Sequence, residues 1–226
     1  MAKTQTAAQL PTLGIIAGGG RLPLQLVEAC QAKGRAVFVL AFEDSADIEA
    51  ISHVPHAVVR LGAVGEALDH LHEAGVGEVV MAGKVKRPSF SALRPDRMGT
   101  KLLARMGGAF FSGDDALLKA IVGFMEEEGF TVIGSDQVLG GLVAPVGVLG
   151  KVHPDQRARD DIAHGLKVLR TLGELDIGQA VIVEHGYVLG VEAAEGTDML
   201  IERCGQLRRN PKSGVLVKAH KPEQET

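Results

Sequence analysis

Three consecutive glycines, Gly18–Gly20, stand where an apolar run ends and a helical pattern begins. The run contains Leu13 and Ile15, and Pro23 suits the first turn of the following helix. Because glycine lacks a Cβ, this corner accepts positive φ and lets another molecule approach the backbone. The N–H groups at a helix start also favour an anion. We therefore predict that a phosphate-bearing ligand binds over Gly18–Leu22.

The spacing of these glycines fits neither of two common phosphate-binding motifs. Pro23 stands where a dinucleotide-binding fingerprint has its third glycine, and no Gly-Lys-Ser/Thr follows, as a P-loop requires. The alternative interpretation is a strand-to-helix turn that needs glycine only for its geometry. The motif alone leaves both interpretations open.

Carboxylates near the C-terminus form a second set of candidates. Glu192, Glu195 and Asp198 lie between an expected hairpin and a helix, with Glu195 and Asp198 spaced to share one face of the helix start. Carboxylates hold Mg²⁺, which with backbone N–H groups would neutralise a diphosphate. The alternative for Glu195, Thr197 and Asp198 is helix capping.

Two other acidic pairs have a simpler interpretation. Asp114 and Asp115 precede an apolar helical pattern, where acids cap free N–H groups and suit the helix dipole. The alternative for this pair is a metal or substrate ligand. Asp160 and Asp161 lie inside a helical pattern and are expected to face solvent.

Two polar residues of the second half stand in apolar surroundings. Gln179 follows Gly178 and either binds a ligand or completes a turn. Lys218 lies in an apolar strand, where a buried lysine is costly unless it is paired. We expect Lys218 to face a sheet edge or a ligand cleft.

Composition excludes several classes of function. The formal net charge of -4 gives no electrostatic reason to expect nucleic acid. Cys30 and Cys204 lie far apart and indicate free thiols in a reducing compartment. The histidines show no zinc-ligand spacing, and no Gly-x-Ser-x-Gly elbow of an esterase occurs.

The elements that must position these residues alternate in the first half of the chain. Apolar runs separated by helical patterns are typical of a doubly wound α/β sheet, whose ligands bind beyond the carboxyl ends of the strands. Gly18–Gly20 and Ala82–Lys84 both lie at that edge. The expected strands are 13–17, 36–41, 57–61, 78–82 and 131–134.

The second half has a different pattern, with a helix over 159–172, a hairpin over 180–193 and a final strand over 215–219. This order indicates a smaller α+β domain. We place the boundary between Gly134 and Gly150. The expected division is a flexible N-terminus, an N-terminal domain and an incomplete C-terminal domain, over residues 1–12, 13–138 and 139–226.

No segment of the sequence predicts secretion or a membrane span. Residues 1–12 lack the apolar core of a signal peptide, and the apolar stretch 138–149 is shorter than the roughly 20 residues a span needs. We expect a soluble, cytoplasmic protein. The segments 98–111 and 138–149, with Met106, Phe110 and Phe111, either line an apolar ligand cavity or pack between domains.

A series of short motifs occurs in a specific order over nearly all of residues 13–226. In this order the chain resembles the LpxI-type UDP-2,3-diacylglucosamine pyrophosphatases of lipid A biosynthesis in Gram-negative bacteria. The motifs are Gly14–Pro23, Ala82-Gly-Lys-Val with Pro88, Gly113–Leu118, Leu149-Gly-Lys, Leu175–Gln179, Val191–Asp198 and Lys221-Pro-x-Gln-Glu.

The resemblance implies a Mg²⁺-dependent hydrolase in which water attacks the α-phosphorus of the UDP-sugar, giving UMP and 2,3-diacylglucosamine 1-phosphate (lipid X). It also implies a Rossmann-like N-terminal domain, an α/β C-terminal domain and a lipid-binding cleft between them. A homodimer in the cytoplasm with transient contact at the inner-membrane surface is expected.

The site residues carried over from the resemblance come from both halves of the chain. The expected metal ligands are Glu195 and Asp198. The expected substrate-binding residues are Gly19, Gly20, Arg21, Ala82, Gly83, Lys84, Gly99, Asp114, Gly178, Gln179, Thr197 and Lys218.

The family's catalytic aspartate follows its Lys-Pro-x-Gln motif in an Asp-Leu-Pro-Thr-Ile-Gly-like segment, and the sequence stops at Thr226, before that segment. No residue here matches that aspartate, so these 226 residues alone are expected to bind substrate weakly and hydrolyse little. The alternative function is a non-hydrolytic nucleotide- or dinucleotide-binding module. Glu43 favours that alternative, because it lies near the end of the second strand, where an NAD site places an acid.

Overall fold

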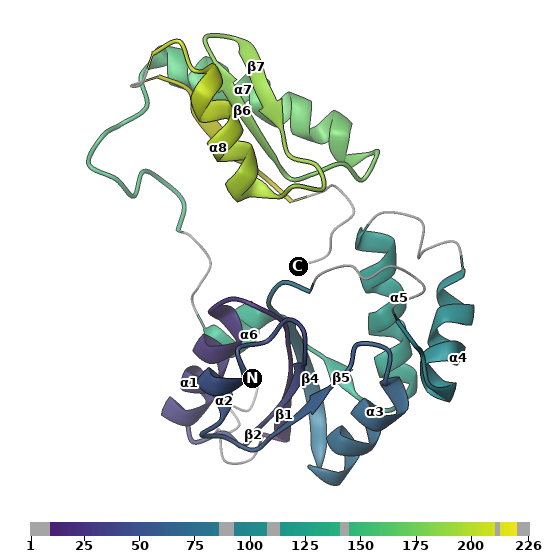
Figure 1. Ribbon diagram of the computed structural model, residues 1–226. Coiled ribbons are helices and arrows are strands. Elements are labelled where there is room, and N and C mark those ends of the chain that lie inside the picture. Colours follow the sequence, from purple (N-terminus) through teal and green to yellow (C-terminus); the bar gives the residue numbers. More distant parts are fainter. Residues whose placement is uncertain (1–9, 86–92, 108–113, 141–144, 211–212, 221–226) are drawn as a thin grey trace, which may run out of the picture. The chain divides into compact units, whose positions relative to one another are not determined.

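The computed structural model describes residues 10–85, 93–107, 114–140, 145–210 and 213–220, which divide into two compact units (Figure 1). The N-terminal unit comprises residues up to Ala144 apart from Gly113–Asp115, and the C-terminal unit continues from Pro145. The elements of the first unit are β1 (Thr12–Ala17), α1 (Leu22–Ala32), β2 (Val37–Phe42), α2 (Ile48–Ile51), β3 (His56–Val59), α3 (Val64–Glu73), β4 (Val76–Ala82), α4 (Arg97–Met106), α5 (Asp114–Glu127), β5 (Thr131–Val132) and α6 (Ser135–Leu139).

The first unit is built on a parallel sheet with the strand order β3-β2-β1-β4-β5. This is the order of the first five strands of a doubly wound dinucleotide-binding sheet. The strands are apolar on both faces because helices cover both faces. The predicted parallel α/β sheet is therefore confirmed, with β1 at its centre.

Two hydrophobic clusters pack this sheet from opposite faces. Leu26 and Val27 of α1 join Val138 of α6 in one cluster. Leu71 of α3 and Phe124 of α5 belong to the other. Val138 is thus a core residue of the N-terminal unit, and Phe110 and Phe111 lie outside the described residues.

The C-terminal unit is smaller and antiparallel, as the predicted α+β pattern requires. Its three-stranded sheet has the order β7-β6-β8, with α7 packed on one face and α8 on the other. The elements of this unit are α7 (Gln156–Gly173), β6 (Ala180–Glu184), β7 (Tyr187–Val191), α8 (Thr197–Leu207) and β8 (Val215–Lys218).

The solvent-facing prediction for Asp161 is wrong, whereas Asp160 is exposed as expected. Asp161 is 4% exposed, and its carboxylate accepts hydrogen bonds from the backbone N–H groups of His185 and Gly186, at 2.9 and 2.7 Å. The physical reason is helical spacing, because Asp161 shares the sheet-facing side of α7 with Gly165. Its carboxylate thereby holds the turn between β6 and β7.

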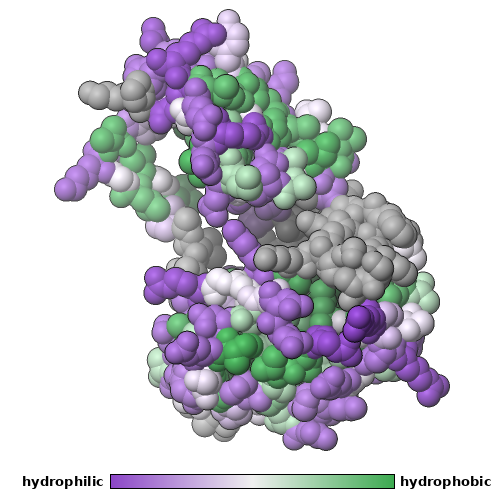
Figure 2. All heavy atoms as spheres, in the orientation of Figure 1, coloured by the Kyte–Doolittle hydropathy of each residue, from purple (hydrophilic) through white to green (hydrophobic). Residues whose placement is uncertain are grey.

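The segment that follows Pro145 exposes apolar side chains. Val146, Leu149 and Val152 are 106%, 71% and 85% exposed. Figure 2 shows hydrophobic residues at the surface along this segment. Among the described helices, none combines the length and the apolar character that crossing a membrane demands.

Candidate functional site

The glycine corner after β1 lies against the end of β4. Gly18 N–H donates to Ala82 O at 2.8 Å, and Gly19 and Lys84 exchange two backbone hydrogen bonds, each 2.8 Å long. The parallel topology puts both segments at the carboxyl edge of the sheet, where ligands of doubly wound folds bind. The structure therefore brings Gly19 and Gly20 together with Ala82–Lys84.

Two of the amides that we expected to be free for a phosphate are already used. The N–H groups of Gly18 and Gly19 bond to β4 and Lys84, which corrects that part of the prediction. A Cβ on Gly18 would lie 2.6 Å from Lys84 O, and one on Gly83 would lie 2.6 Å from Gly19 O. Close backbone packing thus explains the need for glycine at these positions.

Gly20 and the start of α1 remain compatible with an anion. Gly20 has φ +96°, and no atom of the described residues, apart from Gly20 itself and its two chain neighbours, lies within 4 Å of the position its Cβ would take. In the described part of the chain, Arg21 caps α1 without a side-chain hydrogen bond. The phosphate prediction therefore narrows to Gly20, Arg21 and the first turn of α1.

Gly99 serves a junction of two helices. Its N–H donates to Asp96 Oδ1 at 2.6 Å, while Asp96 Oδ2 accepts from Gly65 N–H in α3 at 2.7 Å. A Cβ on Gly99 would lie 2.6 Å from Gly62 O. These contacts give Gly99 a packing role. Asp114 begins α5, but its side chain lies outside the described residues.

Four of the predicted substrate-binding residues meet around Glu192 in the C-terminal unit. Glu192 Oε2 accepts from Gln179 N–H at 2.9 Å, and Oε1 accepts from the Thr197 hydroxyl at 2.5 Å. Lys218 Nζ donates to Thr197 Oγ1 at 2.7 Å and lies 3.8 Å from Glu192 Oε1. Gly178 contributes the backbone that lets this cluster form.

Gly178 has φ +52°, which favours glycine, and a Cβ there would lie 1.9 Å from Glu192 O. This close approach places the next N–H, that of Gln179, against the Glu192 carboxylate. Gln179 therefore contributes its backbone N–H to this cluster, and both interpretations of Gln179, ligand binding or a turn, stay predictions.

Glu192 is 8% exposed and carries its charge inside the cluster. Burial raises the pKa of its carboxyl, but the hydrogen bonds from Thr197 and Gln179, together with the Lys218 charge, outweigh burial and leave the pKa below its ordinary value. Glu192 is thus an ionised acceptor. In the sequence, Glu192 stood out only as a member of an acidic cluster. The one sequence feature that indicated its burial was its position directly after the apolar strand 187–191.

The capping interpretation of Glu195 and Thr197 is wrong. The N-cap of α8 is Gly196, without a side-chain hydrogen bond. Thr197 instead donates to Glu192, and Glu195 Oε1 pairs with Arg203 Nη2 at 2.7 Å while Oε2 accepts from Ala193 N–H at 3.1 Å. The hydrogen bond from Arg203 holds the pKa of Glu195 below its ordinary value.

The predicted metal ligands lie close in sequence but do not make a complete site on their own. Both oxygens of Glu195 have protein partners, and Asp198 is exposed in the first turn of α8. Within the described ranges, no group of three or more His, Cys, Asp or Glu side chains is arranged to hold a metal ion. The magnesium ligands stay a prediction.

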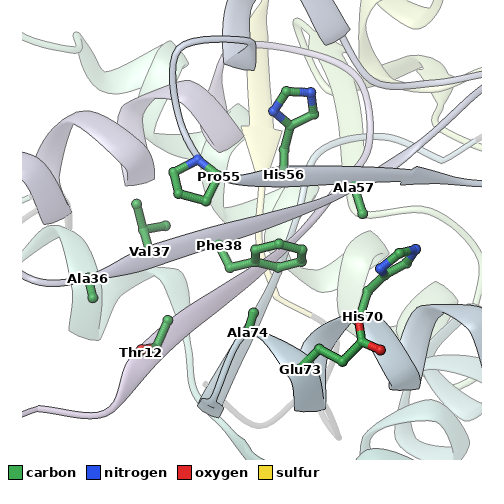
Figure 3. Close-up of a pocket in the computed structure, with 10 residues that line it drawn as sticks. All are labelled: Thr12, Ala36, Val37, Phe38, Pro55, His56, Ala57, His70, Glu73 and Ala74. Carbon is green, nitrogen blue, oxygen red and sulfur yellow. The ribbon is translucent and has the colours of Figure 1, made fainter.

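A pocket of about 510 Å³ lies at the opposite, amino edge of the parallel sheet (Figure 3). Thr12, Phe38 and His56 line it from the starts of β1, β2 and β3, and His70 and Glu73 line it from the end of α3. His56 Nδ1 lies 2.8 Å from Val54 O, so one of its ring nitrogens is engaged. Doubly wound sheets bind ligands at the other edge, so this pocket is not our candidate.

The fold and the site define a two-domain α/β protein with a glycine corner on a parallel sheet and a buried carboxylate cluster in an antiparallel unit. Two family models match the chain, the LpxI N-terminal domain over residues 12–142 and the LpxI C-terminal domain over residues 145–226. The chain belongs to the LpxI family. This confirms the resemblance seen in the sequence.

A curated relative supports the same membership. The UDP-2,3-diacylglucosamine pyrophosphatase LpxI of Caulobacter vibrioides is 44% identical over 220 residues, which cover 95% of this chain and 78% of the relative.

Solved structures give a much weaker likeness. N5-carboxyaminoimidazole synthase of Aspergillus clavatus is 15% identical with a TM-score of 0.29, over 92% of this chain and 41% of that one. The Staphylococcus aureus synthetase is 14% identical with a TM-score of 0.31, over 92% and 47%. The chain spans less than half of either protein, and such low scores say nothing about function.

Proposed function

We propose that the chain is a hydrolase of lipid A biosynthesis that cleaves the pyrophosphate bond of UDP-2,3-diacylglucosamine. Water attacks the α-phosphorus, and the products are UMP and 2,3-diacylglucosamine 1-phosphate, lipid X. The observation that carries the proposal is the 44% identity, across both domains, to a relative named for this activity. The cluster around Glu192 supports it, because four residues predicted from the family meet there.

The chemistry of the two candidate clusters suits a diphosphate. Lys218 presents a half-exposed ammonium beside the start of α8, where the helix dipole also favours negative charge. Gly20 and Arg21 offer a second anion-binding position at the carboxyl edge of the Rossmann-like sheet. We propose both positions as contacts for the substrate.

Mg²⁺ dependence is part of this proposal. Mg²⁺ is commonly held through one or two carboxylates together with substrate phosphates, where it neutralises charge. The described carboxylates are incomplete as a magnesium site, so we propose that phosphate oxygens complete a site with Asp198 and Glu195. Chelation by EDTA should abolish UMP release, and Asp198→Asn should raise the Mg²⁺ concentration needed for half-maximal rate. Unchanged turnover in EDTA would contradict Mg²⁺ dependence.

We also propose a homodimer that works in the cytoplasm and contacts the inner-membrane surface transiently. The support is the family resemblance and the two acyl chains of the proposed substrate. Light scattering should give twice the mass of 23.8 kDa, and sedimentation with anionic lipid vesicles should deplete the protein from the supernatant. A monomeric mass would contradict the homodimer. Full recovery of the protein in the supernatant would contradict the membrane contact.

The decisive test is UMP release from UDP-2,3-diacylglucosamine. The assay runs residues 1–226 beside the LpxI of Caulobacter vibrioides as the positive control. UMP release above the protein-free blank supports the hydrolase. No release by residues 1–226 under conditions in which the relative releases UMP would overturn it.

The alternative function is a non-hydrolytic nucleotide- or dinucleotide-binding module. Glu43 is exposed directly after β2, and its N–H donates to Val59 O at 3.1 Å. This is the position from which an acid contacts the ribose of NAD. Calorimetric titration with NAD and with UDP separates the two functions, because only the alternative predicts that NAD binds.

A further inference from the structure

A connected set of polar contacts in the C-terminal unit ends on the carboxylate of Glu192, to which neither the family resemblance nor the proposed reaction gives a role. We infer that Glu192 is a positioning residue of the substrate site. It fixes the Thr197 hydroxyl and, through that hydroxyl, orients the Lys218 ammonium toward the diphosphate. The inference rests on the proposed function and deepens it.

The direction of the hydrogen bonds follows from the chemistry of the three groups. A lysine ammonium only donates, so Thr197 Oγ1 accepts from Lys218 Nζ at 2.7 Å. The single proton of this hydroxyl is then donated in a hydrogen bond to Glu192 Oε1, at 2.5 Å. The series therefore runs from Lys218 through Thr197 to Glu192, and it requires an ionised carboxylate at its end.

The two ends of this series differ in exposure. Glu192 is 8% exposed, whereas the Lys218 side chain is 52% exposed. Within the described residues, Lys218 Nζ donates one hydrogen bond, to Thr197, so further N–H groups of this ammonium can meet phosphate oxygens. Holding a long, flexible side chain in one orientation lowers the entropy that ligand binding must still remove.

The same carboxylate also fixes the backbone beneath the lysine. Glu192 N–H donates to Ala180 O at 2.8 Å, and Gln179 N–H returns to Glu192 Oε2 at 2.9 Å. Gln179 O in turn accepts from Ala219 N–H at 3.0 Å, next to Lys218. Glu192 is thus connected to Lys218 by two routes, one through side chains and one through the backbone.

A purely structural role is the competing explanation, and Glu184 provides its matched control. Glu184 is 2% exposed and accepts from the N–H groups of Arg209 and Asn210, at 3.0 and 3.4 Å, and from the Ser213 hydroxyl. It is likewise a buried glutamate that accepts backbone and hydroxyl hydrogen bonds, but among the described residues no lysine takes part in its contacts. A structural role predicts similar consequences for both glutamates.

The experiment is a double-mutant cycle on UMP release from UDP-2,3-diacylglucosamine by residues 1–226. Glu192→Gln should lower kcat/KM about tenfold or more, the loss expected for a hydrogen bond to a charged group. In a Lys218→Met background the same change should cost less than about threefold, because the group it positions is gone. Glu184→Gln should lower Tm and leave kcat/KM within about twofold. Additive losses at Glu192 and Lys218, or an equal loss from Glu184→Gln, would overturn the inference.

A second variant and a second readout keep the test decisive. Thr197→Val removes the hydroxyl between Lys218 and Glu192 but leaves the contact between Glu192 and Gln179. It should therefore lower kcat/KM by the factor expected for Glu192→Gln. It replaces Glu192→Gln in the test if that variant fails to fold. If the wild type releases no UMP, the proposed function fails and the cycle is measured in the Kd of UDP. Non-additive effects of Glu192→Gln and Lys218→Met on the Kd of UDP then support the positioning role. Additive effects, or no binding of UDP, overturn it.

Discussion

Gly19 and Lys84 exchange two backbone hydrogen bonds of 2.8 Å, and this pair fastens the glycine corner to the end of β4. The contact requires close approach, because a Cβ on Gly83 would lie 2.6 Å from Gly19 O. The glycines of this corner therefore serve two purposes. Gly18 and Gly83 let the corner and the end of β4 touch, and a Cβ on Gly19 would lie 2.8 Å from Ser45 O, whereas Gly20 leaves space above the helix start.

The first prediction separates these purposes. Gly83→Ala and Gly20→Ala both place a side chain at positive φ, +93° and +96°, but only Gly83 meets backbone atoms. We expect Gly20→Ala to cost about 1 kcal/mol from strain and Gly83→Ala about 3 kcal/mol or more. Urea unfolding measures both, and equal midpoints would contradict the packing role of Gly83.

The second prediction concerns the carboxylate that joins two helix starts. Asp96 caps α4 through Gly99 and also accepts from Gly65 in α3, so Asp96→Ala should cost about 2 kcal/mol, twice an ordinary cap. Asp47, which caps α2 alone at 3.1 Å from Ala50 N, is the matched control. Asp47→Ala should cost about 1 kcal/mol in the same urea titration. A similar loss from both variants would show that the bridge between α3 and α4 adds nothing.

The sequence predicted the layers of the fold because continuous apolar runs and helical periodicity are local signals. It extended the fifth strand to Gly134 and missed α6 (Ser135–Leu139), because five residues show too little periodicity. The start of α4 at Arg97 leaves little signal in the sequence, because the cap at Asp96 follows Pro95 in a segment with the composition of a loop.

The site was predictable only as a set of residues, not as a set of contacts. Gly178, Gln179, Thr197 and Lys218 came from the family resemblance, and the structure adds that they meet at Glu192. That meeting depends on the pairing of β6 with β8, which places Ala180 opposite Lys218, 38 positions later in the chain. Hydrogen-bond partners of this kind leave no local trace in a sequence.

The third prediction is a pH dependence. Hydrogen bonds from Arg209 N–H and the Ser213 hydroxyl hold the pKa of Glu184 below its ordinary value of 4.5. A carboxyl with a lowered pKa in the folded state contributes stability that is present above pH 4.5 and is lost as the pH falls through the folded-state pKa. The Tm difference between the wild type and Glu184→Gln should therefore shrink as the pH is lowered from 6 to about 3. A difference that stays constant over this range would contradict the role given to these hydrogen bonds.

The last prediction tests the backbone approach that builds the Glu192 cluster. Gly178 and Gly186 both have positive φ, +52° and +79°. A Cβ on Gly178 would lie 1.9 Å from Glu192 O, whereas one on Gly186 would have no atom of the described residues within 4 Å apart from Gly186 itself and its chain neighbours. Gly186→Ala should therefore cost about 1 kcal/mol of stability and leave UMP release unchanged. Gly178→Ala must displace either Glu192 or the Gln179 amide, so it should lower kcat/KM about tenfold or more at a temperature where the protein stays folded. If Gly178→Ala lowered Tm without lowering kcat/KM, the backbone at Gly178 would matter for folding but not for the substrate site.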